Sequence, residues 1–266
     1  MDFNKLFSLK GKVALVTGGS RGIGRMIAEG YIAAGAKVYI SARKADACDA
    51  TAADLGDNCI SLPADISTVE GAKALAAEIA ARESRLDILV NNAGAAWGAE
   101  FDEFPESGWD KVMDLNVKSP FFLTQALHGL LKAGASADEP AKVINIASVD
   151  GMRINPWETY SYQASKAALI QLTKRMAVRL VRDDIYVTGI APGAFPSNMN
   201  KAARDAEALV SKSIPNKRVG NTEDMAGAAI FLASRAGNYV IGTTIPVDGG
   251  VVNAWIPSDK YDPEGH

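Results

Sequence analysis

The sequence is poor in the residues that build cross-links and metal sites. It has two cysteines and two histidines among 266 residues. A chain of this length buries enough apolar surface to fold without disulfides. The histidines, His128 and His266, are far apart and belong to no cluster with metal-ligand spacing. We therefore expect no metal site, and a reducing compartment, the cytoplasm, as the location.

Charge of one sign and long apolar runs are lacking too. The chain carries 28 basic and 31 acidic side chains, a net charge of −3, so no basic excess attracts it to nucleic acid. It has no run of about 18 uncharged apolar residues. Lys5, Lys10 and Lys12 interrupt the apolar residues near the amino terminus, so we expect neither a signal peptide nor a membrane anchor. The predicted partners exclude nucleic acid and membrane.

What the sequence has in abundance is apolar material, 48% of residues, arranged in alternating segments. Short β-branched runs alternate with longer stretches of helical period, and several of these runs are apolar on both faces. The pattern predicts an α/β fold of the Rossmann type, a doubly wound, seven-stranded parallel sheet with helices on both faces. Strands are expected at 13–17, 37–41, 59–63, 86–91, 141–148, 185–191 and 243–247, and helices at 21–34, 69–83, 108–131, 160–182 and 222–234.

No linker or repeat divides the chain, so we expect a single domain over 1–266 with its core at about 10–250. Two segments do not fit the alternation. Residues 193–215 form a long connection after the sixth predicted strand, where ligands bind in open α/β sheets, and are a candidate lid. The tail, residues 251–266, indicates no chemistry.

A glycine-rich turn, TGGSRGIG, follows the first predicted strand and opens a helix. Glycines allow the backbone to approach a pyrophosphate, and the amides at the helix start favour its negative charge. A merely tight strand-to-helix turn is the simpler explanation. Its position in a βαβ unit near the chain start favours dinucleotide binding. The candidate cofactor residues here are Gly18, Ser20, Arg21, Gly22, Ile23 and Gly24.

Further motifs follow the turn in order. They are Asp65, the NNAG segment at 91–94, Asn116, Ser148, Tyr162 with Lys166 four residues later, and Pro192 with Gly193. Together with the wide glycine spacing, this ordered set resembles the short-chain dehydrogenase/reductase family over about residues 10–250. The resemblance implies an oxidoreductase that acts on CH–OH or C=O groups with a nicotinamide cofactor.

The end of the second predicted strand indicates which cofactor is used. A carboxylate there binds the 2′-hydroxyl of NAD, whereas arginine pairs with the 2′-phosphate of NADP. By resemblance Ala42 stands where NAD-dependent members carry aspartate, and Arg43 and Lys44 follow, with Arg21 in the glycine turn. The alternative is that Arg43 and Lys44 are only a solvated helix start. We predict NADP(H).

The resemblance implies other cofactor contacts. Asp65 and Ile66 match a pair beside adenine, Asn92 matches an asparagine near the adenine-side ribose, and Asn91 is expected to tie neighbouring strands together. The remaining implied contacts are Tyr162, Lys166, Pro192, Gly193, Phe195 and Ser197, of which Ser197 stands where many relatives carry a threonine that binds the nicotinamide carboxamide.

Tyr162 and Lys166 lie one helical turn apart on one face. A nearby ammonium favours the phenolate and is expected to lower the tyrosine pKa from about 10, so that the phenol can exchange a proton. Two such residues on a helix are otherwise ordinary surface neighbours. By resemblance Tyr162 donates to the carbonyl oxygen, Lys166 binds the nicotinamide ribose, Ser148 holds the substrate oxygen, and Asn116 holds a water for proton resupply.

The predicted substrate pocket is built around Ser148 and Tyr162. Trp97, Met152, Ile154 and Trp157 are its candidate apolar walls, since family members place substrate loops at these positions. Local packing of a longer loop explains the same residues equally well.

The leading hypothesis is therefore reduction of a ketone to a secondary alcohol with NADPH. By resemblance to bacterial 3-oxoacyl reductases, the substrate is expected to be a 3-oxoacyl thioester or related carbonyl. The alternatives are a polyol or sugar-acid dehydrogenase, a reductase of bulky or cyclic ketones, and a non-catalytic NADP-binding sensor or scaffold. Many family members are tetramers, so we expect a homo-oligomer, a tetramer or dimer.

Overall fold

The structure, a computed structural model, describes residues 1–197 and 200–254. Its centre is a seven-stranded sheet of order β3-β2-β1-β4-β5-β6-β7, in which every neighbouring pair is parallel. The predicted fold class is confirmed. The strands are β1 (Val13–Thr17), β2 (Lys37–Ser41), β3 (Cys59–Ser61), β4 (Ile88–Asn91), β5 (Ala141–Ile146), β6 (Ile185–Pro192) and β7 (Thr244–Val247).

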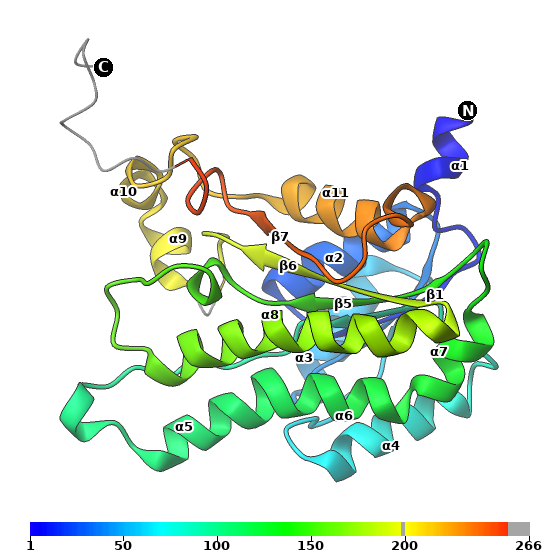
Figure 1. The fold of residues 1–266 in the computed structure, drawn as a ribbon, viewed down its shortest axis with the longest axis horizontal. Coiled ribbons are helices and arrows are strands. Elements are labelled where there is room, and N and C mark those ends of the chain that lie inside the picture. The colour runs from blue at the N-terminus through cyan, green and yellow to red at the C-terminus, as the bar shows by residue number, and fades with distance from the viewer. Residues whose placement is uncertain (198–199, 255–266) are drawn as a thin grey trace.

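Helices cover both faces of this sheet (Figure 1). On one face lie α2 (Gly22–Ala33), α3 (Ala45–Leu55) and α11 (Thr222–Ala233). On the other lie α4 (Val69–Ala80), α5 (Glu106–Met113), α6 (Ser119–Ala126), α7 (His128–Gly134) and α8 (Tyr160–Leu180). The shorter helices are α1 (Phe3–Phe7), α9 (Lys201–Asp205) and α10 (Glu207–Lys212).

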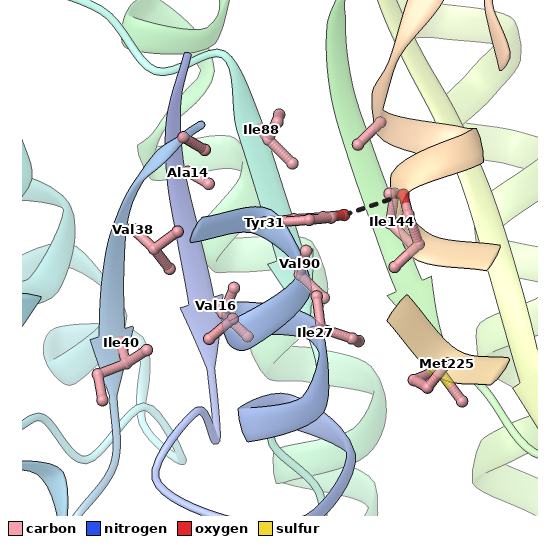
Figure 2. Close-up of a cluster of buried hydrophobic side chains, with 14 of the residues drawn as sticks. Ala14, Val16, Ile27, Tyr31, Val38, Ile40, Ile88, Val90, Ile144 and Met225 are labelled. Carbon is pink, nitrogen blue, oxygen red and sulfur yellow. Dashed lines mark hydrogen bonds between the residues drawn. The ribbon is translucent and has the colours of Figure 1, made fainter. Parts of the chain in front are cut away.

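Alternation along the strands divides the interior into two cores. In β1, Ala14 and Val16 face α2 and α11, while Val13 and Leu15 face α4 and α6. Figure 2 shows the first core, where the Tyr31 hydroxyl donates to the backbone carbonyl of Ala229 at 3.3 Å. Because both faces are buried, each strand needs apolar residues at successive positions, which is why these segments read as continuous apolar runs.

The strand order places the turning point of the topology between β1 and β4. Chain connections leave β1 towards β2 and β3 on one side, and leave β4 towards β5, β6 and β7 on the other. The loops at the carboxyl ends of these two strands therefore diverge and leave room for a ligand. The glycine turn follows β1 and the NNAG segment follows β4, so both lie at this point.

The structure differs from the sequence expectations in several places, one of which is the short helix α1, which was not expected. Helix α3 was not expected, because its alanines and aspartates give weak periodicity. The helix expected over 108–131 is divided into α5, a π-helical turn at Asp114–Lys118, α6 and α7. The candidate lid, 193–215, contains α9 and α10, and its residues 198–199, like 255–266 of the tail, lie outside the described residues. None of the helices described is long and apolar enough to cross a membrane.

Candidate active site

The glycine turn after β1 is folded so closely that side chains are excluded from it. Gly18 has a φ of +66°, in the left-handed region. A Cβ on Gly24 would lie 2.3 Å from the carbonyl oxygen of Gly18 and 2.4 Å from Nδ2 of Asn92. The start of α2, where the first amides of a helix have no partner within it, is thereby brought against the turn, as an anion site requires.

Two polar side chains hold this turn in place. The Asn92 amide donates to the carbonyl oxygens of Thr17, at 2.8 Å, and Gly18, at 3.2 Å. The Thr17 hydroxyl accepts the backbone amides of Asn92 and Ala93, each at 3.0 Å. Asn91 ties β4 to β5 through a 2.9 Å bond to Asn145, as expected. The side-chain amide of Asn92 thus donates its hydrogen bonds to the turn, and contact of this residue with a ribose stays a prediction.

The cations expected near the 2′-phosphate are accessible. Arg21 caps α2, Arg43 follows β2, and both are exposed. Within the described ranges, neither forms an ion pair with a carboxylate. Arg25, one turn into α2, is paired with Asp54 instead.

The expected adenine contacts lie beyond β3. The Asp65 carboxylate accepts the Ser67 backbone amide at 3.0 Å, and this bond, with a smaller contribution from the charge of Arg43, lowers the pKa of Asp65. The Ile66 side chain is buried in the second core. Only the backbone of Ile66 is therefore available to a ligand. Ile23 is half-buried, and Ser20 is fixed by a 2.8 Å bond from the Thr51 hydroxyl to its carbonyl oxygen.

Asn116 lies in the π-helical turn, which directs its amide inward. Its Oδ1 accepts the Ala95 backbone amide at 2.8 Å, and its Nδ2 donates to the Ala95 carbonyl and the Ser165 hydroxyl, each at 2.9 Å. Ser165 donates in turn to the carbonyl of Tyr162 at 2.7 Å. Asn116 therefore fixes the loop after β4 to the start of α8. The water expected at this residue stays a prediction.

Lys166 is buried at the carboxyl end of β5. Its ammonium donates to the Ile146 carbonyl at 2.8 Å and lies 5.6 Å from the centroid of the Tyr162 ring. Burial lowers the pKa of Lys166 to about 8, and the charge of Asp150 opposes this shift. A Cβ on Gly94 would lie 3.1 Å from Oδ1 of Asn116 and 3.7 Å from Nζ of Lys166. These groups thus form one connected cluster.

The expected lowering of the tyrosine pKa is wrong for this structure. Burial raises the pKa of Tyr162 to about 12; a hydrogen bond from Ser148 opposes this shift and the charge of Asp150 adds to it. The ammonium of Lys166 is directed at the Ile146 carbonyl, so it does not stabilise the phenolate. Tyr162 keeps its proton at neutral pH, the state that a proton donor needs.

Ser148 ends the extended backbone after β5 and is buried. Its hydroxyl oxygen accepts the Asp150 backbone amide at 3.1 Å. The same hydroxyl forms the hydrogen bond to Tyr162 that opposes the rise in the Tyr162 pKa, so the two hydroxyl groups lie together.

The loop after β6 lies against the glycine turn. A Cβ on Gly22 would be 3.2 Å from Cβ of Ser197, and the Ser197 hydroxyl accepts the Asn200 amide at 3.0 Å. Pro192 ends β6, and the Gly193 amide donates to the Val247 carbonyl at 2.9 Å. The Phe195 side chain is buried, and a Cβ on Gly220 would lie 2.4 Å from its ring. Any cofactor contact of Phe195 must therefore involve its backbone.

The expected substrate residues are not gathered into a closed pocket. Ile154 and Trp157 are 87% and 69% exposed, and Met152 is half-buried beside the 3-10 turn Val149–Gly151. Trp97 packs against α5, where a Cβ on Gly108 would lie 2.7 Å from its ring and the Lys111 ammonium lies 5.1 Å from the ring centroid. A role in substrate binding stays a prediction for all four.

Sequence reasoning missed several residues that the structure brings to the site. Thr17 and Ser165 position the turn and the helix, and Asp150 lies two residues after Ser148. An aromatic cluster also joins the loop after β4 to the start of α8, with Tyr160 in edge contact with Phe101 and Phe104, each at 5.6 Å between ring centroids. The closeness of Asp150 to Ser148 was visible in the sequence, whereas the aromatic contacts join distant segments and had no local signal.

Comparisons with known proteins agree with this geometry. Residues 18–252 match the family described as enoyl-(acyl carrier protein) reductase. The chain is 52% identical over 249 residues to a rhamnolipids biosynthesis 3-oxoacyl-[acyl-carrier-protein] reductase of Pseudomonas aeruginosa, covering 92% of this chain and 97% of that protein. It is 39% identical over 255 residues to a 2-dehydro-3-deoxy-D-gluconate 5-dehydrogenase of Dickeya dadantii, covering 92% and 96%.

Solved structures give the same picture. The Pseudomonas aeruginosa RhlG/NADP active-site complex matches with a TM-score of 0.90 and 51% identity, over 93% of this chain and 99% of that one. A gluconate 5-dehydrogenase of Burkholderia cenocepacia in complex with NADP and tartrate matches with a TM-score of 0.87 and 35% identity, over 96% and 100%.

Proposed function

Because this chain belongs to the short-chain dehydrogenase/reductase family, we propose that it reduces the ketone of a 3-oxoacyl thioester to a secondary alcohol with NADPH. The observation that carries the proposal is the cluster of Asn116, Ser148, Tyr162 and Lys166 at the carboxyl edge of the sheet, beside the glycine turn. The 52% identity to a 3-oxoacyl-[acyl-carrier-protein] reductase supports the substrate class.

The residues present fit an NADP molecule. Gly18 and Gly24 let the turn pack closely against Asn92, where a Cβ would clash, so backbone and not side chains borders the start of α2. Arg21 and Arg43 are exposed beside the turn. No acid stands at Ala42 to compete with a 2′-phosphate. When bound, the nicotinamide supplies a hydride to the carbonyl carbon.

The chain's own residues supply the proton and the orientation. Ser148 donates its hydroxyl proton in a hydrogen bond to the carbonyl oxygen, and Tyr162, protonated at neutral pH, transfers its proton to that oxygen as negative charge develops there. Lys166 is held between β5 and the Tyr162 ring, where it binds a ribose hydroxyl and supports return of the proton from solvent. Asn116 fixes the loop and the helix that carry these groups.

A sugar-acid or polyol dehydrogenase is the second candidate, favoured by the 39% identity to a 2-dehydro-3-deoxy-D-gluconate 5-dehydrogenase. The two are separated by measuring NADPH oxidation with 3-oxoacyl thioesters, 5-keto-D-gluconate and cyclic ketones. The proposal expects the highest kcat/KM for a thioester. A higher value for the keto sugar acid would replace it with the second candidate, and a higher value for cyclic ketones with a reductase of bulky ketones.

We also propose that the chain forms a homo-oligomer, a tetramer or dimer, in the cytoplasm. Trp109, Phe121 and Val178 are 41%, 39% and 62% exposed on α5, α6 and α8, and a second copy would cover them. The free thiols of Cys48 and Cys59 support a reducing location. Light scattering during size-exclusion chromatography tests the assembly, and a monomeric mass would contradict it.

A further inference from the structure

An acidic side chain lies beside the catalytic cluster and has no part in the proposed chemistry. Asp150 is in the 3-10 turn that follows Ser148, and its backbone amide donates to the Ser148 hydroxyl at 3.1 Å. The next residue holds this turn against α8, since a Cβ on Gly151 would lie 2.6 Å from the carbonyl carbon of Lys166. The position of Asp150 is therefore fixed relative to both Ser148 and Lys166.

The carboxylate of Asp150 is not neutralised. It is half-buried, and within the described part of the chain it forms no ion pair or side-chain hydrogen bond. Its charge acts on both Tyr162 and Lys166. The other elements that pack around these groups contribute amides and hydroxyls, from Asn116 and Ser165, and among the described residues Asp150 is the one carboxylate whose charge acts on Tyr162 and Lys166.

The segments that border the crevice on this side are acidic as well. The loop after β4 and the loop after β5 are joined by a 3.2 Å bond from the Ala99 amide to the Glu158 carbonyl. These two segments carry exposed carboxylates at Glu100, Asp102, Glu103, Glu106 and Glu158. Glu158 and Asp102 together raise the pKa of Tyr160, with the Glu158 hydrogen bond as the larger cause. The loop after β5 also carries one exposed cation, Arg153, three residues after Asp150, so the negative charge of this rim is a net excess.

We infer that Asp150 determines substrate specificity by excluding ketones that carry an anionic group close to the carbonyl. Ser148 and Tyr162 would position the carbonyl oxygen, and the Asp150 backbone amide is bonded to the Ser148 hydroxyl, so the substituents of the substrate carbon would lie near residue 150. A carboxylate on the substrate would meet a like charge where water is partly excluded and screening is weak. A neutral thioester or ester meets no such repulsion.

This inference rests on the proposed function and extends it. It explains how a fold shared with sugar-acid dehydrogenases can favour thioesters: the excluded substrates are free 3-oxo acids and keto sugar acids, and the accepted ones are neutral around the ketone. The inference concerns charge alone, so it applies to small ketones as well as to long acyl chains.

The test compares matched neutral and anionic ketones. Ethyl acetoacetate is paired with acetoacetate, and an N-acetylcysteamine 3-oxoacyl thioester with the free 3-oxo acid. For each pair, kcat/KM with NADPH is measured for the wild type, Asp150→Asn, Asp150→Ala and the charge-retaining Asp150→Glu. We expect the wild type to prefer the neutral member and Asp150→Asn to reduce that preference by about tenfold. Asp150→Glu should restore most of it.

Controls separate this effect from damage to the site. Glu103→Gln removes one exposed charge at the rim and should change the preference by less than about twofold at about 0.15 M salt. The dissociation constant of NADPH should be the same in all variants. An unchanged neutral-to-anionic ratio in Asp150→Asn, or a wild-type preference for the anion, would overturn the inference.

The two proposals fail in different ways. If the wild type reduces ethyl acetoacetate but no thioester, the proposed substrate is wrong while the charge comparison in the small pair still decides the role of Asp150. If thioesters are reduced and the neutral-to-anionic ratio of kcat/KM is the same in the wild type and the Asp150 variants, the proposed function is supported and the specificity inference is wrong.

Discussion

Charged residues have different partners at the two edges of the sheet. At the amino edge, buried Asp87 accepts the backbone amide of Val13 at 2.8 Å and lies 3.4 Å from the Lys12 ammonium and 3.5 Å from Arg85. Asp183 is surrounded there by Lys132, Arg179 and His128, whose hydrogen bonds lower its pKa, with that of Lys132 the largest contribution.

At the carboxyl edge, in contrast, Arg21, Arg43 and Asp150 have no ionic partner among the described residues, although Arg218 at this edge pairs with Asp224. Arg21 and Arg43 are exposed beside the glycine turn, and Asp150 is half-buried beside Ser148. The Lys166 ammonium is bound to a backbone carbonyl and not to a carboxylate. The comparison indicates that ion pairs at the amino edge stabilise the fold, whereas the unpaired charges beside the glycine turn and Ser148 remain available for ligands. Substitutions at the two edges should therefore have separable effects.

The largest effect is expected from Tyr162→Phe. The ring keeps its packing but loses the proton donor, so ketone reduction should fall by about 10²- to 10⁴-fold. The NADPH dissociation constant and the thermal midpoint should change little. Steady-state turnover and fluorescence titration check this, and turnover near the wild-type value would rule out Tyr162 as the proton donor.

At the amino edge, Asp87→Ala should act on stability alone. The Val13 amide would lose its acceptor and Arg85 its carboxylate, while Lys12 would keep only Glu139, which lowers the free energy of unfolding by about 2–4 kcal/mol. Urea unfolding measures the loss. Glu139→Gln, which weakens an exposed pair with Lys12, is the control and should cost less than about 1 kcal/mol. Reduced turnover per folded molecule in Asp87→Ala would show that substitutions at the amino edge affect activity as well as stability.

Arg43→Ala should weaken NADPH binding by about 10- to 100-fold, because a charged hydrogen bond to the 2′-phosphate is lost. NADH binding should stay nearly constant, since NADH lacks that phosphate. Arg25→Ala is the control, because Arg25 is already paired with Asp54. Equal weakening of both cofactors by Arg43→Ala would show that the residue is structural.

The smallest effect is expected from Trp157→Ala. Its side chain is 69% exposed, so stability should change by less than about 0.5 kcal/mol. If the loop after β5 contacts an acyl chain, the KM for long-chain substrates should rise about threefold while that for short-chain substrates stays constant. No change in either KM would leave Trp157 a residue of local packing.

The sequence was most informative where one physical requirement controls several neighbouring residues. Strands buried on both faces need continuous apolar runs, so their places were predicted to within a few residues, as with Val13–Thr17 and Ile185–Pro192. Close backbone packing at Gly18 and Gly24 likewise requires glycine. Helix α3 was not predicted, because it has only three buried residues, Cys48, Thr51 and Ala52, and they give a weak periodic pattern.

The substrate side was less predictable for a physical reason. The candidate walls follow from where family members place substrate loops, yet Ile154 is exposed and Trp97 packs on α5. The positions of loop residues depend on contacts with distant segments, such as the bond between Ala99 and Glu158. Local sequence patterns do not predict such contacts. The pKa of Tyr162 differs from the expectation for a similar reason, because burial raises it and the Lys166 ammonium is directed at the Ile146 carbonyl.

The most direct test of the account is a single turnover with NADPH deuterated at C4 of the nicotinamide on the transferred face. With a 3-oxoacyl thioester in excess, we predict one equivalent of alcohol per NADPH oxidised, with deuterium on the new carbinol carbon. NADPH that binds tightly but is oxidised by none of the carbonyl compounds tested would contradict the account and identify the chain as a cofactor-binding protein without catalytic activity.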